Sequence, residues 1–328
     1  MTNKTKWGVM GCGGIADKYA RDLAFTRYGK LAAVGSRSKA KAQTFAAQHG
    51  GVRAYGSYED LAADPDVDII YVATPHPCHM ENTLLAIKHG KHVLCEKSFA
   101  MNAKQTRRMI AAAQKKGVFL MEAMWTRFFP AMGRLRKWLA EGRIGKVLAV
   151  EADFGIHFKM GPQHRIFNPA LGGGALLDLG IYPISLASMI YGAQPETIVS
   201  TVHKHSTGVD DRALIAFEYA NGATAAISTS SVVCMKNEAR IFGAEGMITV
   251  HEMFLRPNQL TLKMEGKPPK TFDFPFTGHG MHFEADHVHQ CLRKGQTESD
   301  IMPLNETLGI IQTMDKIRKQ WKLKYPGE

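Results

Sequence analysis

The sequence lacks the patterns of disulfide-bonded, secreted and membrane proteins. Its five cysteines are an odd number and form no Cys-x-x-Cys pair, which predicts free thiols in a reducing compartment. No uninterrupted apolar run is long enough to span a bilayer, and the polar residues 1–6 lead into an apolar stretch without the pattern of a signal peptide. We therefore expect a cytoplasmic protein with no membrane partner.

Positive charge is in excess but is not concentrated. Lys and Arg number 41 against 30 Asp and Glu, which gives a formal net charge of +11 at pH 7. The basic residues are spread along the chain among acids, and no Lys/Arg block or known nucleic-acid motif appears. The excess therefore favours an anionic cofactor over nucleic acid, which we do not expect as a partner.

The 14 histidines make a metal site worth considering. Close pairs such as His203/His205 and His287/His289 have no companion cysteine or carboxylate cluster at ligand spacing. The sequence therefore predicts no bound metal.

Residues 6–16 have the pattern of a short strand, a glycine turn and the start of a helix. Gly11, Gly13 and Ala16 occupy the three small-residue places of G-x-G-x-x-[GA]. The first glycine allows a sharp turn, the second lets the backbone approach a pyrophosphate over the helix N-terminus, and the third small residue allows close helix–strand packing. The residues predicted to contact a dinucleotide in this turn are Gly11, Gly13, Gly14, Ile15 and Ala16.

The order of predicted elements indicates two domains in a chain of 328 residues. Apolar strands alternate with helices up to about residue 121, as in a doubly wound parallel sheet. Beyond about residue 125, alternating strands joined by turns such as Asn221-Gly222 predict an open, largely antiparallel sheet. We predict an α/β protein with a Rossmann domain at 1–123 and a substrate-binding and oligomerisation domain at 124–328, with the last helices able to pack back on the first domain. Apolar positions on an exposed sheet face predict a homodimer or higher homo-oligomer.

The end of the second predicted strand indicates which dinucleotide is bound. NAD-binding domains of this kind carry an acid there that binds the ribose 2′-hydroxyl. Here the strand ends without an acid, and Ser36, Arg37 and Lys41 can donate to a 2′-phosphate. We predict NADP, with NAD the less favoured alternative.

Two further strand ends point at the same crevice, because ligands bind at the carboxyl ends of the strands in such sheets. One strand leads into Thr74, His76 and His79, and the next into Glu96 and Lys97. A lysine there can hold positive charge close to a reacting oxygen. The alternative interpretation of Glu96-Lys97 is an ordinary exposed ion pair.

A third group of residues follows His164-Arg165. Three glycines at 172–174 would let the backbone pass close to a ligand, and in the segment after them Asp178 and Tyr182 would share one face of a helix. Beside a lysine and an oxidised nicotinamide, the tyrosine would have its phenol pKa lowered from about 10 and could act as a general base. The alternative is a tyrosine in the core.

Three motifs together resemble the Gfo/Idh/MocA family of oxidoreductases over nearly the whole chain. They are GCGGIA at the N-terminus, CEKS at 95–98 and GGGALLDLGIYP at 172–183. The stretch MEAMWTRFFP at 121–130 is similar to the branch of dimeric dihydrodiol dehydrogenases and NADP-dependent D-xylose 1-dehydrogenases. The resemblance implies a Rossmann domain followed by an α/β domain whose open sheet commonly forms a dimer.

The resemblance also implies roles for individual residues. Lys97 is implied to be the catalytic lysine, followed by Ser98 where the family motif E-K-P has proline. The motif D-x-G-x-[HY] places Asp178 and Tyr182 in the site, and Arg165 is implied to face the nicotinamide end of the cofactor. The pocket walls implied by the resemblance are Trp125, Arg127 and Phe154.

The predicted function is NADP-dependent hydride transfer to or from a hydroxyl or carbonyl carbon of a sugar, polyol or trans-dihydrodiol. Tyr182 would exchange the proton, Lys97 would hold charge, and Asp178 would orient them. Two alternatives are a sensor that binds dinucleotide without turnover and a nicotinamide-dependent glycoside-cleaving enzyme. The presence of all three residues weighs against the sensor.

Overall fold

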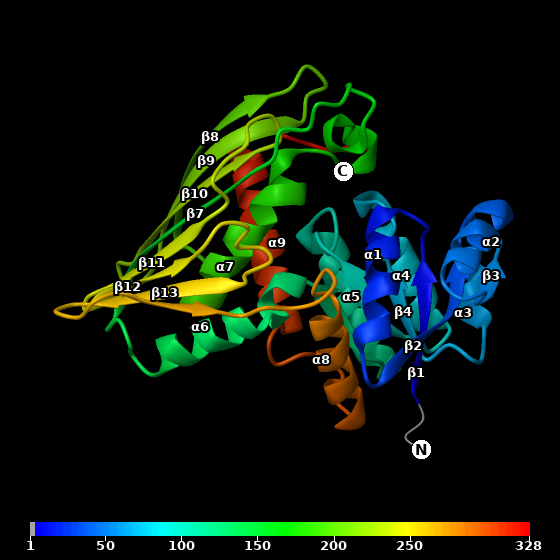
Figure 1. Ribbon diagram of the computed structural model, residues 1–328. Coiled ribbons are helices and arrows are strands. Elements are labelled where there is room, and N and C mark those ends of the chain that lie inside the picture. The colour runs from blue at the N-terminus through cyan, green and yellow to red at the C-terminus, as the bar shows by residue number, and fades with distance from the viewer. Residues whose placement is uncertain (1–3) are drawn as a thin grey trace. The chain divides into compact units, whose positions relative to one another are not determined.

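The computed structural model describes residues 4–328, which form two compact units. Unit 1 contains the chain up to Phe128 together with Thr277–Leu308, and unit 2 contains Phe129–Phe276 and Gly309–Glu328. Unit 1 therefore includes helix α8, His282–Arg293, from far along the sequence. Figure 1 labels the elements of both units.

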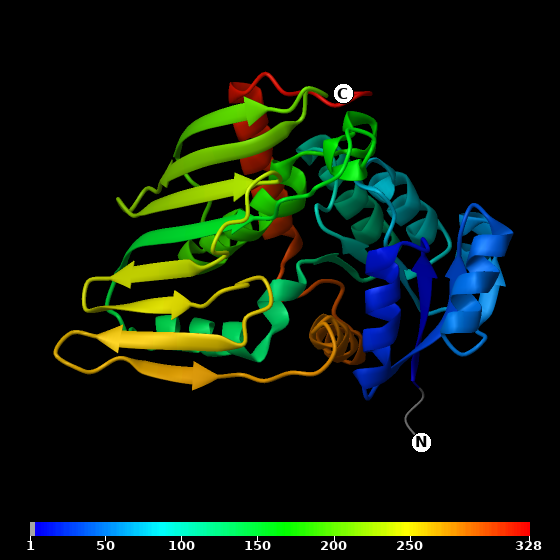
Figure 2. The same cartoon turned by 45° about the horizontal axis from the view of Figure 1, so that its top comes forward.

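Unit 1 is built on a six-stranded parallel sheet of order β3-β2-β1-β4-β5-β6, as the alternation of strands and helices predicts. The order reverses between β1 and β4, and ligands bind outside the carboxyl ends of strands at such a point. Figure 2 shows this sheet with its helices. Its elements are β1 Thr5–Met10, α1 Gly14–Asp22, β2 Gly29–Gly35, α2 Lys39–Gln48, β3 Arg53–Tyr55, α3 Tyr58–Ala63, β4 Ile69–Val72, α4 His79–Lys88, β5 His92–Glu96, α5 Ala103–Lys116 and β6 Leu120–Ala123.

The α8 segment is joined to the N-terminal part of unit 1 by buried polar contacts. The carboxylate of Asp22, which is 1% exposed, accepts the backbone N–H groups of His279, at 2.9 and 3.0 Å, and of Met281, at 2.8 Å. The Trp7 indole N–H donates to Nε2 of His289 over 2.9 Å. These contacts satisfy polar groups that burial would otherwise leave without partners.

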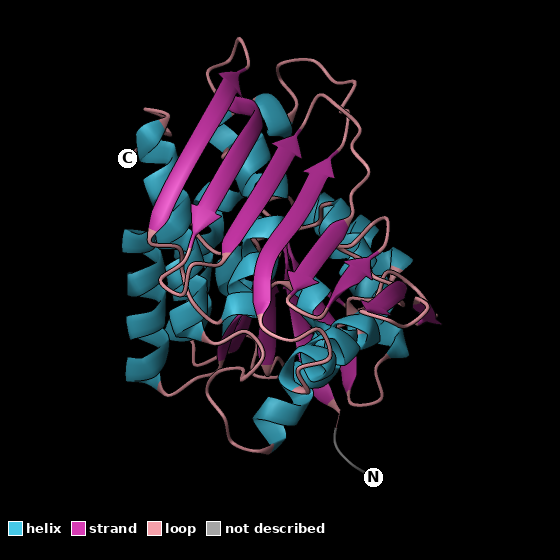
Figure 3. Ribbon diagram, turned by 90° about the vertical axis from the view of Figure 1, so that its left-hand side faces the viewer, coloured by secondary structure: helices cyan, strands magenta, loops and turns pink. Residues whose placement is uncertain are grey.

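Unit 2 is built on an eight-stranded sheet of order β14-β13-β12-β11-β7-β10-β9-β8. Only the pair β7–β10 is parallel, so the predicted, largely antiparallel sheet is confirmed. In Figure 3 the strands of this sheet face the viewer and helices lie behind them. Its elements are α6 Pro130–Ala140, β7 Val147–Gly155, α7 Ile181–Tyr191, β8 Thr197–Lys204, β9 Asp210–Glu218, β10 Thr224–Ser230, β11 Ala239–Gly243, β12 Gly246–Val250, β13 Gln259–Met264, β14 Lys270–Asp273 and most of α9 Leu304–Gln320.

One long apolar helical stretch of the described chain lies inside unit 2. Residues Pro169–Tyr191 are long and apolar enough, by length and composition, to cross a membrane. However, 89% of the apolar window is buried within the fold, which is the environment of a core helix. This stretch carries two of the predicted site residues, so the core packing of unit 2 also positions them.

Candidate active site

The glycine turn after β1 has the geometry that a dinucleotide phosphate requires. Gly11 has φ +111°, and a Cβ there would lie 2.8 Å from the carbonyl oxygen of Ala73, so only glycine fits. Gly13 caps α1 without a side-chain hydrogen bond, and a Cβ on Gly13 or Gly14 would meet nothing within 4 Å. The start of α1 is therefore open beside Gly13 and Gly14, and a helix N-terminus favours an anion. Ile15 is half-buried, and Ala16 is fully buried against the sheet.

The residues predicted to select the cofactor lie together after β2. Ser36 is 8% exposed, and its hydroxyl contributes a hydrogen bond that lowers the pKa of the Cys12 thiol against the larger effect of burial. Lys41 acts on the same thiol through its charge. Burial raises the pKa of the Tyr58 phenol, and the guanidinium charge of Arg37 opposes that rise. Two cationic side chains and a hydroxyl thus lie near Cys12 and Tyr58, and this set of donors suits a 2′-phosphate.

The two histidines after β4 connect that strand end to the Lys97 loop. His79 is 0% exposed, with Nε2 2.7 Å from the carbonyl oxygen of Thr74 and Nδ1 2.9 Å from that of Ser98. Burial lowers the pKa of His79 to about 3, so the ring is neutral and donates to one of the two carbonyls. Nε2 of His76 lies 3.3 Å from the carbonyl oxygen of Lys97. The histidines therefore position the loops that would surround a ligand.

Lys97 follows β5 on a loop held by buried carboxylates. The backbone N–H of Lys97 donates to Oε2 of Glu96 over 3.1 Å, and the Tyr71 hydroxyl donates to Oε1 of the same group. The backbone N–H of Phe99 donates to Oε1 of Glu122 over 3.1 Å. The peptide bond between Lys97 and Ser98 is cis. The lysine backbone is therefore held from both sides.

The predicted pocket residues of unit 1 are buried. Trp125 is 7% exposed and Arg127 is 2% exposed. The Arg127 guanidinium lies 2.7 Å from Oε1 of Glu306 and donates to the carbonyl oxygen of Ile301 over 3.2 Å. Arg127 thus anchors the segment before α9, a contact between residues nearly 180 positions apart that the sequence motif did not reveal.

In unit 2, the structure brings Arg165 and Asp178 together. Nη1 of Arg165 lies 2.9 Å from both carboxylate oxygens of Asp178. The Asp178 side chain is 3% exposed, whereas that of Arg165 is 52% exposed. The arginine can therefore neutralise a buried carboxylate and still present part of its guanidinium to a ligand.

Tyr182 lies near the start of α7, but the segment before it is not the regular α-helix that the sequence suggested. Residues Leu176–Gly180 form a π-helical turn, so Asp178 and Tyr182 are not related by α-helical spacing. Tyr182 is 6% exposed, and its ring packs edge-to-face on Phe154, with centroids 5.3 Å apart. Phe154, predicted as a pocket wall, thus contacts the predicted general base.

We predicted that the glycines before this turn would let the backbone pass close to a ligand, but protein atoms occupy the space beside Gly173 and Gly174. A Cβ on Gly173 would lie 2.5 Å from the carbonyl oxygen of Arg165. Gly174 has φ +122°, and a Cβ there would lie 2.3 Å from Oδ1 of Asp210. The same aspartate accepts the backbone N–H of Leu176 through Oδ2 over 2.6 Å. The absence of side chains at Gly173 and Gly174 therefore lets this turn pack against the buried carboxylate of Asp210.

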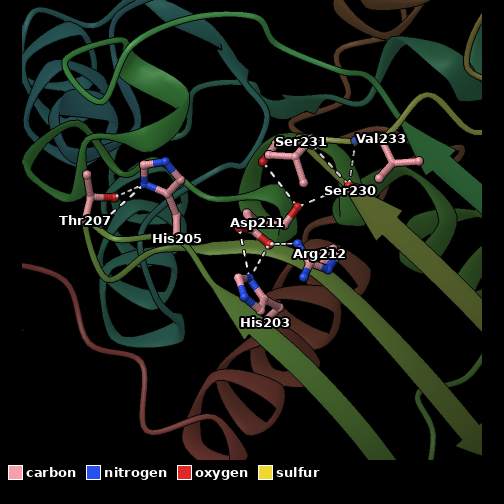
Figure 4. Close-up of polar contacts among 9 residues, drawn as sticks. His203, His205, Thr207, Asp211, Arg212, Ser230, Ser231 and Val233 are labelled. Carbon is pink, nitrogen blue, oxygen red and sulfur yellow. Dashed lines mark hydrogen bonds and ion pairs between the residues drawn. The ribbon is translucent and has the colours of Figure 1, made fainter.

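The strand that carries Asp210 is fixed by the residue after it. The backbone oxygen of Asp211 accepts the Ser231 N–H at 2.7 Å and the hydroxyls of Ser230 and Ser231 at 3.3 and 3.2 Å. Its carboxylate accepts from His203 at 3.0 Å (Figure 4). These contacts join β8, β9 and β10 beneath the Asp178 turn.

We predicted no metal ligands beside His287, because the sequence showed no companion cysteine or carboxylate at ligand spacing, but the structure brings a cluster of ligating atoms together in unit 1. His287 and Cys291 lie one turn apart on α8, and Asp300 joins them from the following loop. The ligating atoms of the three residues lie within 4.8 Å of one another. The spacing H-x-x-x-C was visible in the sequence, but the carboxylate comes from a loop whose return to α8 only the fold reveals.

Comparison with known proteins identifies the family. Residues 5–124 match the model of an oxidoreductase family with an NAD-binding Rossmann fold, and residues 132–249 match the GFO/IDH/MocA C-terminal domain. The chain belongs to the Gfo/Idh/MocA oxidoreductase family, which confirms the resemblance found in its motifs.

The particular relatives are dehydrogenases and a ketoreductase. The chain is 38% identical to trans-1,2-dihydrobenzene-1,2-diol dehydrogenase of Bos taurus, over 98% of both chains. It is 36% identical to D-xylose 1-dehydrogenase (NADP(+)) of Hypocrea jecorina, over 98% of this chain and 93% of the relative. A solved structure of a 3-ketoreductase from Actinomadura kijaniata in complex with NADP and TDP-benzene is 27% identical, with a TM-score of 0.86 over 97% of this chain and 98% of that one.

The buried carboxyl of Asp210 should make stability depend on pH. Burial raises the pKa of Asp210 to about 6, against the opposing hydrogen bond from Leu176. The folded protein therefore holds a proton that the unfolded chain loses near pH 4, so the contribution of this group to stability falls as pH rises from about 4 to 6. Asp210→Asn should remove that loss, which amounts to about 3 kcal/mol for a shift of about two pKa units.

The measurement is urea unfolding of both proteins from pH 4 to pH 8. We expect the variant to gain stability relative to the parent with rising pH, up to about pH 6. The exposed Asp273→Asn is the control for loss of a surface carboxylate. A difference between Asp210→Asn and the parent that does not change with pH would contradict the assignment.

Proposed function

We propose that this protein is an NADP-dependent dehydrogenase or reductase acting on a CH–OH group of a small sugar, polyol or trans-dihydrodiol. The observation that carries the proposal is in unit 1. An open helix N-terminus at Gly13 and Gly14 and the Lys97 loop lie at strand ends of one parallel sheet. The names of the relatives, a diol dehydrogenase and an NADP-dependent xylose dehydrogenase, support the same chemistry.

The residues around the two strand ends fit the cofactor. The N–H groups that begin α1 would bind the pyrophosphate, and Ser36, Arg37 and Lys41 would bind the 2′-phosphate. No carboxylate follows β2 to favour the 2′-hydroxyl of NAD. When bound, NADP supplies the acceptor or donor of a hydride.

The side chains would handle the proton and the charge. Tyr182 would take the proton of the substrate hydroxyl during oxidation and return it during reduction. The ammonium group of Lys97 would stabilise negative charge on the same oxygen. Asp178, held by Arg165, would orient this group of residues. The proton that Tyr182 takes up during oxidation must return to solvent before the next turnover, and reduction requires the reverse exchange.

Cofactor absorbance tests the proposal directly. Purified protein is incubated with NADP+, and in parallel with NAD+, and a panel of aldoses, inositols and trans-dihydrodiols, while reduced cofactor is followed at its absorbance maximum. We expect reduction with NADP+ for one substrate class and much slower reduction with NAD+. Tight NADPH binding without turnover of any substrate, in either direction, would favour a sensor or a glycoside-cleaving enzyme instead.

Replacement of the lysine should separate chemistry from binding. Lys97→Met removes the charge while keeping much of the side-chain volume, so we expect kcat to fall by about 10²–10⁴-fold, the range typical for loss of a positioned acid–base or charge-stabilising group. NADPH affinity, measured by fluorescence, should change little. Lys88→Met, at a 72% exposed lysine, is the matched control. Near-normal turnover in Lys97→Met would refute the assignment.

We infer that the protein also forms a homodimer through the open face of its eight-stranded sheet, and that it acts in the cytoplasm. Val199 and Leu214 are 64% and 56% exposed. The strand register places Val199 opposite Ala216 and Leu214 opposite Thr201, so they are diagonal neighbours on one face. Such apolar residues on an uncovered sheet favour a partner surface.

The proposed cytoplasmic location has separate support. The five free cysteines fit a reducing compartment.

A charge on this face should prevent dimer formation. Leu214→Lys would bury an unpaired ammonium in the interface, so we expect the mass in solution to fall from twice the 36.2 kDa chain to the single chain, measured by light scattering. Leu148 is 48% exposed but, by its register on β7, points to the opposite side of the sheet. Leu148→Lys should therefore remain dimeric. A parent protein that is monomeric at micromolar concentration would contradict the inference.

A further inference from the structure

The cluster of His287, Cys291 and Asp300 has the geometry of a metal site. Nε2 of His287 lies 3.3 Å from Sγ of Cys291 and 3.6 Å from Oδ1 of Asp300. Around a tetrahedral zinc ion with bonds of about 2.0 Å to nitrogen and oxygen and about 2.3 Å to sulfur, these separations would be about 3.5 and 3.3 Å. These two distances agree with zinc coordination to within a few tenths of an ångström, and all three ligating atoms lie within 4.8 Å of one another.

Three potential ligating groups converge on one nitrogen atom of His287. The Ser299 hydroxyl lies 2.7 Å from the same Nε2 atom. Sγ of Cys291 is also within hydrogen-bonding distance of this nitrogen, and the Asp300 carboxylate forms an ion pair with it when the ring is protonated. A cation between the nitrogen, the sulfur and the carboxylate oxygen would account for the nearness of all three ligands.

The surroundings hold two ligands rigidly and leave the third able to move. His287 is 11% exposed, and its ring packs on Phe128 with centroids 4.9 Å apart, which fixes the ring plane. Cys291 is 1% exposed, one helical turn away. The Asp300 side chain is 73% exposed, so it can rotate onto an ion without losing buried contacts. Asp300 also lines a pocket with residues 295–299, so its carboxylate is accessible to a hydrated ion.

We propose that His287, Cys291 and Asp300 bind a zinc ion that joins α8 to the loop after it. Imidazole, thiolate and carboxylate are a ligand set suited to Zn²⁺, and the fourth position would take water or the Ser299 hydroxyl. On binding, the cysteine thiol releases its proton to solvent, and no electron is transferred. The loop contains Ile301, whose carbonyl oxygen accepts from Arg127, so the ion would stiffen the same segment that Arg127 anchors.

Cobalt is the probe that reports the ligands, because Co²⁺ adopts the same site and a thiolate–cobalt bond gives a charge-transfer band in the near ultraviolet. Metal-free full-length protein is titrated with Co²⁺ under reducing conditions and then with Zn²⁺. We expect one equivalent to produce that band together with the visible bands of tetrahedral cobalt, and Zn²⁺ to displace it. Zn²⁺ at a hundredfold excess over its Kd should raise Tm by several degrees.

Variants assign the site. Cys291→Ser should abolish the thiolate band, and Cys234→Ser, at an exposed cysteine, should retain it. Asp300→Asn, at a side chain that is 73% exposed, should change the metal-free Tm little and weaken Co²⁺ binding by about tenfold or more. The proposal is overturned if the parent binds no equivalent of either ion, if the band persists in Cys291→Ser, or if Asp300→Asn binds as tightly as the parent. None of these results depends on cofactor or substrate turnover.

Discussion

The hydrogen bond from a loop N–H to a buried carboxylate is the interaction on which the arrangement of this protein depends. Where the chain leaves a strand or helix inside the protein, its backbone N–H groups need other hydrogen-bond acceptors, because burying an N–H group without an acceptor costs about 1–3 kcal/mol. Here acidic side chains supply the acceptor in four segments, among them the Lys97 loop and the turn that carries Asp178. These acids are Asp22, Glu96, Glu122 and Asp210.

Burying these carboxylates destabilises their charged form, and their pKa values show this. Burial raises the pKa of Glu122 to about 7 and that of Asp210 to about 6, because a charge is less stable away from water. Asp22 shows the opposite balance, since the hydrogen bonds that it accepts and the nearby His282 outweigh burial and lower its pKa. The balance between burial and the donors around each acid therefore decides whether its pKa rises or falls.

Several features could be predicted from the sequence because they depend on neighbours in the chain. The glycine turn at Gly11 and Gly13 and the alternation of strands and helices led to the parallel sheet, and the missing acid after β2 led to the cofactor choice. The three glycines at 172–174 were identified in the sequence, but we predicted a ligand beside them where the structure has protein atoms beside Gly173 and Gly174. The freedom of Gly173 and Gly174 was visible in the sequence, but the atoms that they approach, in Arg165 and Asp210, come from other segments.

The sequence by itself determined the family, the class of sheet in each unit and the residue types at the strand ends, since local periodicity and short motifs encode them. Only the tertiary structure decided which partners those residues meet. Arg127 contacts Glu306, Leu176 meets Asp210, and Asp300 returns to His287, and no periodicity relates the members of such pairs. The physical reason is that long-range contacts are selected by the packing of whole elements, and a side chain has no local signal for what that packing brings beside it.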